Sequence, residues 1–145
     1  MSTLPTQLGL EQDLPAVQQL VADHGAELRA GADPGVFWLS MRPAAAPQET
    51  FHARIAWTTY PDAPPSIKFA DAVEGRLNIT SAWPIIPGYR PGNFDICQPF
   101  TAEAYVVHQE WRTGPEAWPS DGNPFEWVVG RLLHDMCDHY QGRSG

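Results

Sequence analysis

A run of alternating side chains between Phe51 and Thr59 constrains the fold of this chain most strongly. The apolar positions of the run are Phe51, Ala53, Ile55 and Trp57. Because successive side chains of a strand point to opposite faces, this pattern predicts a β-strand with one buried face. Regular pairing must end soon afterwards, since Pro61, Pro64 and Pro65 lack amide donors and have a fixed φ.

Two neighbouring segments are expected to be strands as well. Residues 36–41 form a short apolar run between two turn-rich stretches, which is typical of a buried strand. Residues 66–69 resume an extended pattern after the prolines. The long stretch from residue 70 to residue 119 carries many Pro and Gly residues, and only residues 104–108 are predicted to be regular within it.

One helix is predicted on each side of these strands. Asp13 can cap a helix over residues 14–29, and Gly25 weakens this helix without forbidding it. Asn123 can cap a second helix that begins at Pro124 and whose apolar stripe extends to Tyr140. Residues 141–145 are expected to fray.

The composition excludes several classes of protein. A chain of 145 residues with 43% hydrophobic content fits one domain, spanning residues 1–145, with one substantial core. The formal net charge of −8 opposes binding to nucleic acid, because such binding relies on basic side chains that displace counterions. The sequence has no signal-peptide pattern and no run of eighteen apolar residues, so we expect a cytoplasmic protein without a membrane partner.

The two cysteines, Cys97 and Cys137, are expected to be free thiols in a reducing compartment. Taken alone, Cys97 lies among apolar residues, which is more typical of an inert core thiol. Cys137 lies on the final helix and is interpreted as structural. His134 and Asp138 share a helical face there, but no zinc-type pairing of ligands accompanies them, so neither a metal nor a cofactor is expected.

The block from Phe51 to Phe69, with its Tyr60-Pro61 and Pro64-Pro65 pairs, resembles the third-strand signature of ubiquitin-conjugating enzymes. Further similarities lie downstream, in Asp95-Ile96-Cys97 (hydrophobic-Cys motif), Trp118-Pro119 and the Asn123-capped helix. The resemblance implies an α+β fold with an N-terminal helix, an antiparallel meander of about four strands, an active-site segment and a C-terminal helix. The usual last two helices of the family are missing.

The resemblance also implies an activity. Family members accept a ubiquitin-like protein from an activating enzyme that uses ATP, hold it as a Cys thioester and pass it to an amine of a target protein. Cys97 would be the nucleophile, and Asn78 would stabilise the oxyanion formed on attack. Asn78 is equally compatible with a simple turn residue. The expected setting is a bacterial pathway similar to ubiquitination, in which some systems serve antiviral defence.

The acceptor amine must lose a proton, and three side chains are candidates to take it: His108, which we rank first, Asp95 and Asp121. Two other functions remain open. The chain could be a catalytically inactive binding module of the same fold, which holds a ubiquitin-like protein or a partner enzyme. It could also be a small cysteine hydrolase that uses Cys97 with His108 or His134 as the base.

Overall fold

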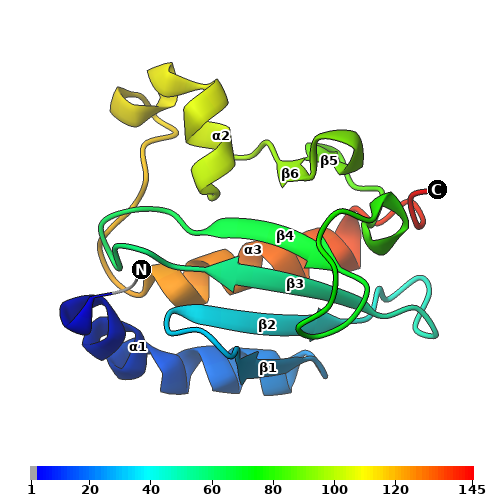
Figure 1. The fold of residues 1–145 in the computed structure, drawn as a ribbon, viewed down its shortest axis with the longest axis horizontal. Coiled ribbons are helices and arrows are strands. Elements are labelled where there is room, and N and C mark those ends of the chain that lie inside the picture. Colours follow the sequence, from blue (N-terminus) through cyan, green and yellow to red (C-terminus); the bar gives the residue numbers. More distant parts are fainter. Residues whose placement is uncertain (1–2) are drawn as a thin grey trace.

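The computed structural model describes residues 3–145, and its centre is a four-stranded antiparallel sheet (Figure 1). The strands follow one another in space as in the chain: β1 (Glu27–Ala30), β2 (Val36–Met41), β3 (Phe51–Ala56) and β4 (Ser66–Ala70). Helix α1 (Leu4–Asp23) precedes the sheet and helix α3 (Pro124–Asp138) follows it. The predicted α+β arrangement of N-terminal helix, antiparallel strands and C-terminal helix is confirmed.

Strand β3 carries the alternation that the sequence predicted. Its residues alternate strictly between buried and half-buried, and Ala53 lies opposite Leu39 of β2 and Phe69 of β4. Helix α3 packs against the same face, where Phe125 contacts Phe37 with ring centroids 4.9 Å apart. The core therefore lies between one face of the sheet and the two long helices.

The first helix differs from its prediction at both ends. Helix α1 begins at Leu4, where the side chain of Thr3 accepts a hydrogen bond from the amide of Thr6 at 3.4 Å. Asp13 is not a cap: it lies inside the helix, and its carboxylate accepts a hydrogen bond from the Tyr60 hydroxyl. Pro15 also lies inside the helix, at an exposed position, although a proline there removes one helical hydrogen-bond donor.

The same helix ends early because Gly25 terminates it. Gly25 has φ +67, and its amide donates to the carbonyl of Ala22 at 3.1 Å, while the amide of Ala26 donates to that of Val21 at 3.0 Å. This pair of bonds is a Schellman motif, in which a left-handed glycine closes a helix. Residues 27–29, predicted as helix, instead begin the edge strand β1.

Helix α3 forms as its sequence predicted. The side chain of Asn123 accepts a hydrogen bond from the amide of Glu126 at 2.9 Å, and Pro124 occupies the first turn. The helix ends at Asp138, and Tyr140 packs beyond it against Phe51.

The 71–122 segment, between β4 and α3, is more structured than predicted. It contains a two-stranded ribbon of β5 (Tyr89–Arg90) and β6 (Asp95–Ile96), and the short helix α2 (Ala102–Val107). Three 3-10 turns complete it: η1 (Thr80–Ala82), η2 (Pro91–Asn93) and η3 (Gln109–Thr113). In Figure 1 the ribbon and α2 lie beyond β4, at one side of the sheet.

The last residues are held rather than frayed. Backbone bonds join Gln141 and Gly142 to Ile85, at 2.9 and 2.7 Å. The guanidinium of Arg143 lies 4.1 Å from the ring centre of Phe51 and binds the Glu49 carboxylate at 2.6 Å. These contacts were missed because none of them follows a local sequence pattern. Within residues 3–145, no helix has both the length and the apolar character needed to cross a bilayer.

Candidate active site

Cys97 directly follows strand β6 and is half-buried. Its backbone amide donates to the carbonyl of Gly88 at 2.7 Å, which extends the β5–β6 ribbon by one bond. Gly88 has φ +87, and a Cβ there would lie 2.8 Å from the side chain of Gln98. The backbone conformation therefore favours glycine at this position, and a larger residue would also displace the Gln98 side chain.

An ion pair joins the two strands of this ribbon. Arg90 on β5 donates to both carboxylate oxygens of Asp95 on β6, at 2.8 and 2.7 Å. The hydrogen bond to Asp95 is the main reason that the pKa of Arg90 is raised above its usual range, and the nearby Cys97 acts in the same direction. The candidate base Asp95 thus has both oxygens occupied by a guanidinium.

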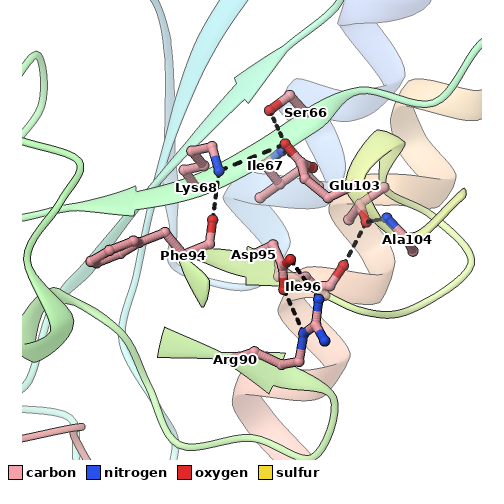
Figure 2. A network of polar contacts seen from close by, with 10 residues as sticks. Ser66, Ile67, Lys68, Arg90, Phe94, Asp95, Ile96, Glu103 and Ala104 are labelled. Carbon is pink, nitrogen blue, oxygen red and sulfur yellow. Dashed lines mark hydrogen bonds and ion pairs between the residues drawn. The ribbon is translucent and has the colours of Figure 1, made fainter. Parts of the chain in front are cut away.

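Strand β4 holds the ribbon from the other side (Figure 2). The ammonium of Lys68 donates to the carbonyl of Phe94 at 2.6 Å and lies 3.9 Å from the Glu103 carboxylate. Glu103 in turn accepts hydrogen bonds from the hydroxyl of Ser66 and, at 3.4 Å, from the amide of Ile67. We call Ser66, Lys68 and Glu103 the β4 clamp.

Lys68 of the β4 clamp binds the backbone at Phe94, a residue in a strained conformation. Phe94 has φ 54, a left-handed conformation that costs a residue with a side chain about 1–3 kcal/mol. Its carbonyl is the one that Lys68 binds, three residues before Cys97. On the other side of the thiol, the hydroxyl of Thr101 donates to the Ile96 carbonyl at 2.6 Å and accepts from the Ala104 amide at 3.2 Å, so it also caps α2.

Helix α3 supplies a second set of anchors, one helical turn apart. Arg131 donates to the side-chain oxygen of Gln98 at 2.8 Å, and Gln98 donates to the carbonyl of Pro87 at 2.8 Å. Tyr89 donates to the carboxylate of Asp135 at 2.8 Å. Residues on both sides of the thiol are therefore tied to one face of α3.

The Tyr89–Asp135 bond lies in the core. Asp135 is only 3% exposed, and burial, followed by the charge of Asp135, raises the pKa of Tyr89 well above its usual value. Sequence reasoning missed this anchor, although a charged residue within the apolar stripe of a helix was a usable signal. Buried carboxylates nearly always have a specific partner.

An open groove of about 530 Å³ begins two residues beyond the thiol. Its walls include Pro99, Trp127 of α3 and the loop before α3, and Arg131 lies at its side. Arg131 also stacks on Phe100 and Trp127, with its guanidinium carbon 4.9 and 5.6 Å from the ring centres. The candidate base Asp121 is exposed and lines this groove.

The remaining candidates lie elsewhere in the segment. His108 follows α2, stacks on Trp111 with ring centroids 4.1 Å apart, and approaches the Glu110 carboxylate at 3.2 Å. Asn78 is exposed in the loop between β4 and η1. The structure thus brings Asp95 to the ribbon of Cys97 and Asp121 to the groove that begins at Pro99, while the contacts of His108 are with its own turn.

The His134 and Asp138 side chains, which share a helical face, lie on the surface of α3. His134 approaches Asp138 at 3.0 Å, and both are exposed, as is Cys137. In the described part of the chain, no group of three or more His, Cys, Asp and Glu side chains is arranged to hold an ion.

Comparisons with known proteins do not place the chain: a scan of protein-family models, a search of curated proteins and a search of solved structures each return no match.

Proposed function

We propose that this protein is a ubiquitin-conjugating-like enzyme that carries a ubiquitin-like protein as a thioester on Cys97. The observation that carries the proposal is the position of this thiol. It is half-buried, it ends a ribbon that β4 and α3 anchor, and an open groove begins two residues further along the chain, at Pro99. Anchoring of this kind suits a nucleophile that must meet a second protein in a defined orientation.

The reaction would run in two steps. The Cys97 thiolate attacks the thioester carbonyl on the activating enzyme, a new C–S bond forms, and the thiolate of that enzyme leaves. A target amine then attacks the Cys97 thioester, the C–N bond forms, and Cys97 leaves as a thiolate while a base takes the amine proton. ATP is consumed earlier, by the activating enzyme.

Among the candidate bases, the geometry favours Asp121. It is exposed and lines the groove that begins at Pro99, whereas Asp95 is held by Arg90 and His108 is held by Glu110 and Trp111. We expect Asp121→Asn to slow transfer to lysine by about 10²-fold and to leave charging of Cys97 unchanged. Asn78 keeps its proposed role as the oxyanion donor, and Asn78→Ala should slow the same step.

The test is a charging assay with the ubiquitin-like protein and activating enzyme encoded by neighbouring genes, with ATP, on reducing and non-reducing gels. Wild type should form an adduct that thiols remove, and Cys97→Ser should form a thiol-resistant oxyester. Cys137→Ser is the matched control, because Cys137 is exposed on α3, and it should charge like wild type. Charging of Cys97→Ala, or no adduct when the activating enzyme itself is charged, would refute the proposal.

A second candidate function is a binding module of the same fold that performs no chemistry. It is favoured by the fact that Asp95 and His108 are both engaged by other side chains. A module of this kind would bind the ubiquitin-like protein equally well as wild type and as Cys97→Ala, and neither form would charge.

A further inference from the structure

A polar pocket lies on the face of the sheet that α3 does not cover. It has a volume of about 400 Å³, within the roughly 300–1,000 Å³ of small-molecule sites. Its walls come from the end of α1, from β1, β2, β3 and their flanking turns, and from the loop after β4: Gly25, Glu27, Arg29, Ser40, Arg42, Thr50, His52 and Val73. None of these residues takes part in the proposed thioester chemistry.

A serine and a histidine that are hydrogen-bonded to each other line this pocket. Ser40 on β2 lies opposite His52 on β3, and the hydroxyl oxygen is 2.8 Å from Nδ1 of the imidazole. When Nδ1 carries the proton, the histidine donates to the serine and the hydroxyl proton is free to bind a ligand. Both residues lie within paired strands, so no free backbone amides surround them, which favours binding over acyl transfer.

Apart from His52, the charged residues that line the pocket are two arginines, Arg29 and Arg42, and one glutamate, Glu27, in a chain of net charge −8. Arg29 is paired with Glu27 at 2.7 Å. Arg42 is exposed and joins none of the ion pairs found among residues 3–145. An unpaired guanidinium that lines the same pocket as hydroxyl and imidazole groups gives the donor set that oxyanions bind.

We propose that this pocket binds a phosphoryl group, held by the guanidinium of Arg42 and the side chains of Ser40 and His52. A phosphoryl group carries two negative charges and three acceptor oxygens, so it can use donors that come from separate strands at once. A carboxylate has one charge and two oxygens and would satisfy fewer of them. Thr50 lines the same pocket and offers a further hydroxyl.

Binding of this dianion must be linked to protonation of His52. The pKa of His52 is lowered, first by burial and then by Arg143 and Arg29, while Asp71 and Glu27 oppose the shift. In the free protein the imidazole therefore loses its proton at a lower pH than an unperturbed histidine does. A bound phosphoryl group adds negative charge beside it and must raise this pKa, and protonation must strengthen binding to the same extent.

The experiment is an NMR titration of the His52 ring with sodium phosphate at constant ionic strength, with sodium acetate as the monocarboxylate reference. His52→Gln assigns the signal. We expect saturable shifts with phosphate, weak shifts with acetate, and a higher His52 pKa in the phosphate series. Arg42→Gln should weaken phosphate binding about tenfold or more. Arg112→Gln, an exposed arginine outside this pocket, should bind like wild type.

The source of the phosphoryl group is resolved by a parallel titration with phosphoserine. Tighter binding of phosphoserine identifies a phosphorylated ligand, and tighter binding of inorganic phosphate identifies the free ion; both outcomes support a phosphoryl site. The proposal is overturned if millimolar phosphate causes no saturable shift. It is also overturned if Arg42→Gln and wild type bind phosphate equally well, or if acetate matches phosphate.

Discussion

Two regions of this molecule are held together by different interactions. The frame, made of α1, β1–β4 and α3, is joined by buried apolar side chains such as Phe69, Phe125 and Leu132. The 71–122 segment also has apolar contacts with the core, but its ribbon and the adjoining Gln98 are fixed by hydrogen bonds. Lys68 and Arg131 donate to this segment, and Asp135 accepts from Tyr89. Apolar burial fixes the packing of the frame without specifying individual atoms, whereas hydrogen bonds fix the position of the ribbon through specific pairs of atoms.

The largest effect is expected from a cavity in the frame. Phe125 is fully buried and packs its ring on Phe37, Trp57 and Tyr60. We expect Phe125→Ala to lower the free energy of unfolding by about 3–5 kcal/mol, as large-to-small changes in cores do. Urea unfolding measures this loss. A loss comparable to that of Tyr140→Phe, which removes one hydroxyl from a half-buried ring, would show that the helix–sheet interface is not the main source of stability.

A smaller effect is expected from the buried anchor of the ribbon. Tyr89→Phe leaves the carboxylate of Asp135 without this donor in the core, which should cost about 1–3 kcal/mol. Asp135→Asn retains an acceptor for Tyr89 and should cost less. Urea unfolding of both variants makes the comparison. A larger loss for Asp135→Asn than for Tyr89→Phe would contradict the assignment of Tyr89 as the donor.

Alkaline pH offers a third test of the same anchor. The folded state raises the pKa of Tyr89 above its unfolded value of about 10, so the stabilisation is fully present below that pH. Above it, the unfolded chain loses the proton first, and stability falls as pH rises toward the folded pKa, by up to about 1.4 kcal/mol per pH unit for this group. Unfolding free energies measured between pH 9 and 11 should fall less steeply in Tyr89→Phe than in wild type. Parallel curves would refute the anchor's contribution.

The smallest effect on global stability is expected from the β4 clamp. Lys68→Met removes the donor to the Phe94 carbonyl and should cost about 1 kcal/mol, because the ammonium is partly exposed. The local effect should be larger: the amide of Cys97 should exchange its hydrogen faster, while amides of β3 keep their protection. Hydrogen exchange followed by NMR measures the local effect at Cys97 and the protection of β3 separately. Equal acceleration in both places would show that ribbon and frame open together.

These forces explain which parts of the fold could be predicted from the sequence. Strand β2 and helix α3 match their predicted positions because periodic burial and caps are local patterns. Helix α1 was misplaced because Asp13 and Gly25 each allow two interpretations, and the choice depends on Tyr60 and on the edge strand. Tertiary contacts decide such cases.

The candidate site was predictable only in part. The position of Cys97 was inferred from motifs on either side of it, and in the structure it directly follows strand β6, two residues before the groove begins at Pro99. The anchors of that ribbon join residues far apart in the chain, such as Tyr89 and Asp135, and no spacing rule connects them. The bases were the least predictable, because which carboxylate is occupied depends on neighbours such as Arg90.

The β4 clamp has a practical consequence for labelling. Lys68 is the only lysine of the chain, and its ammonium is occupied by Phe94 and Glu103. Apart from the α-amino group, an amine-reactive dye therefore has a single attachment point, which becomes fully reactive only when the ribbon lifts from β4. The rate at which such a dye couples to Lys68 would therefore report the rate of that opening. Intact-protein mass spectrometry would measure it without any substitution in the chain.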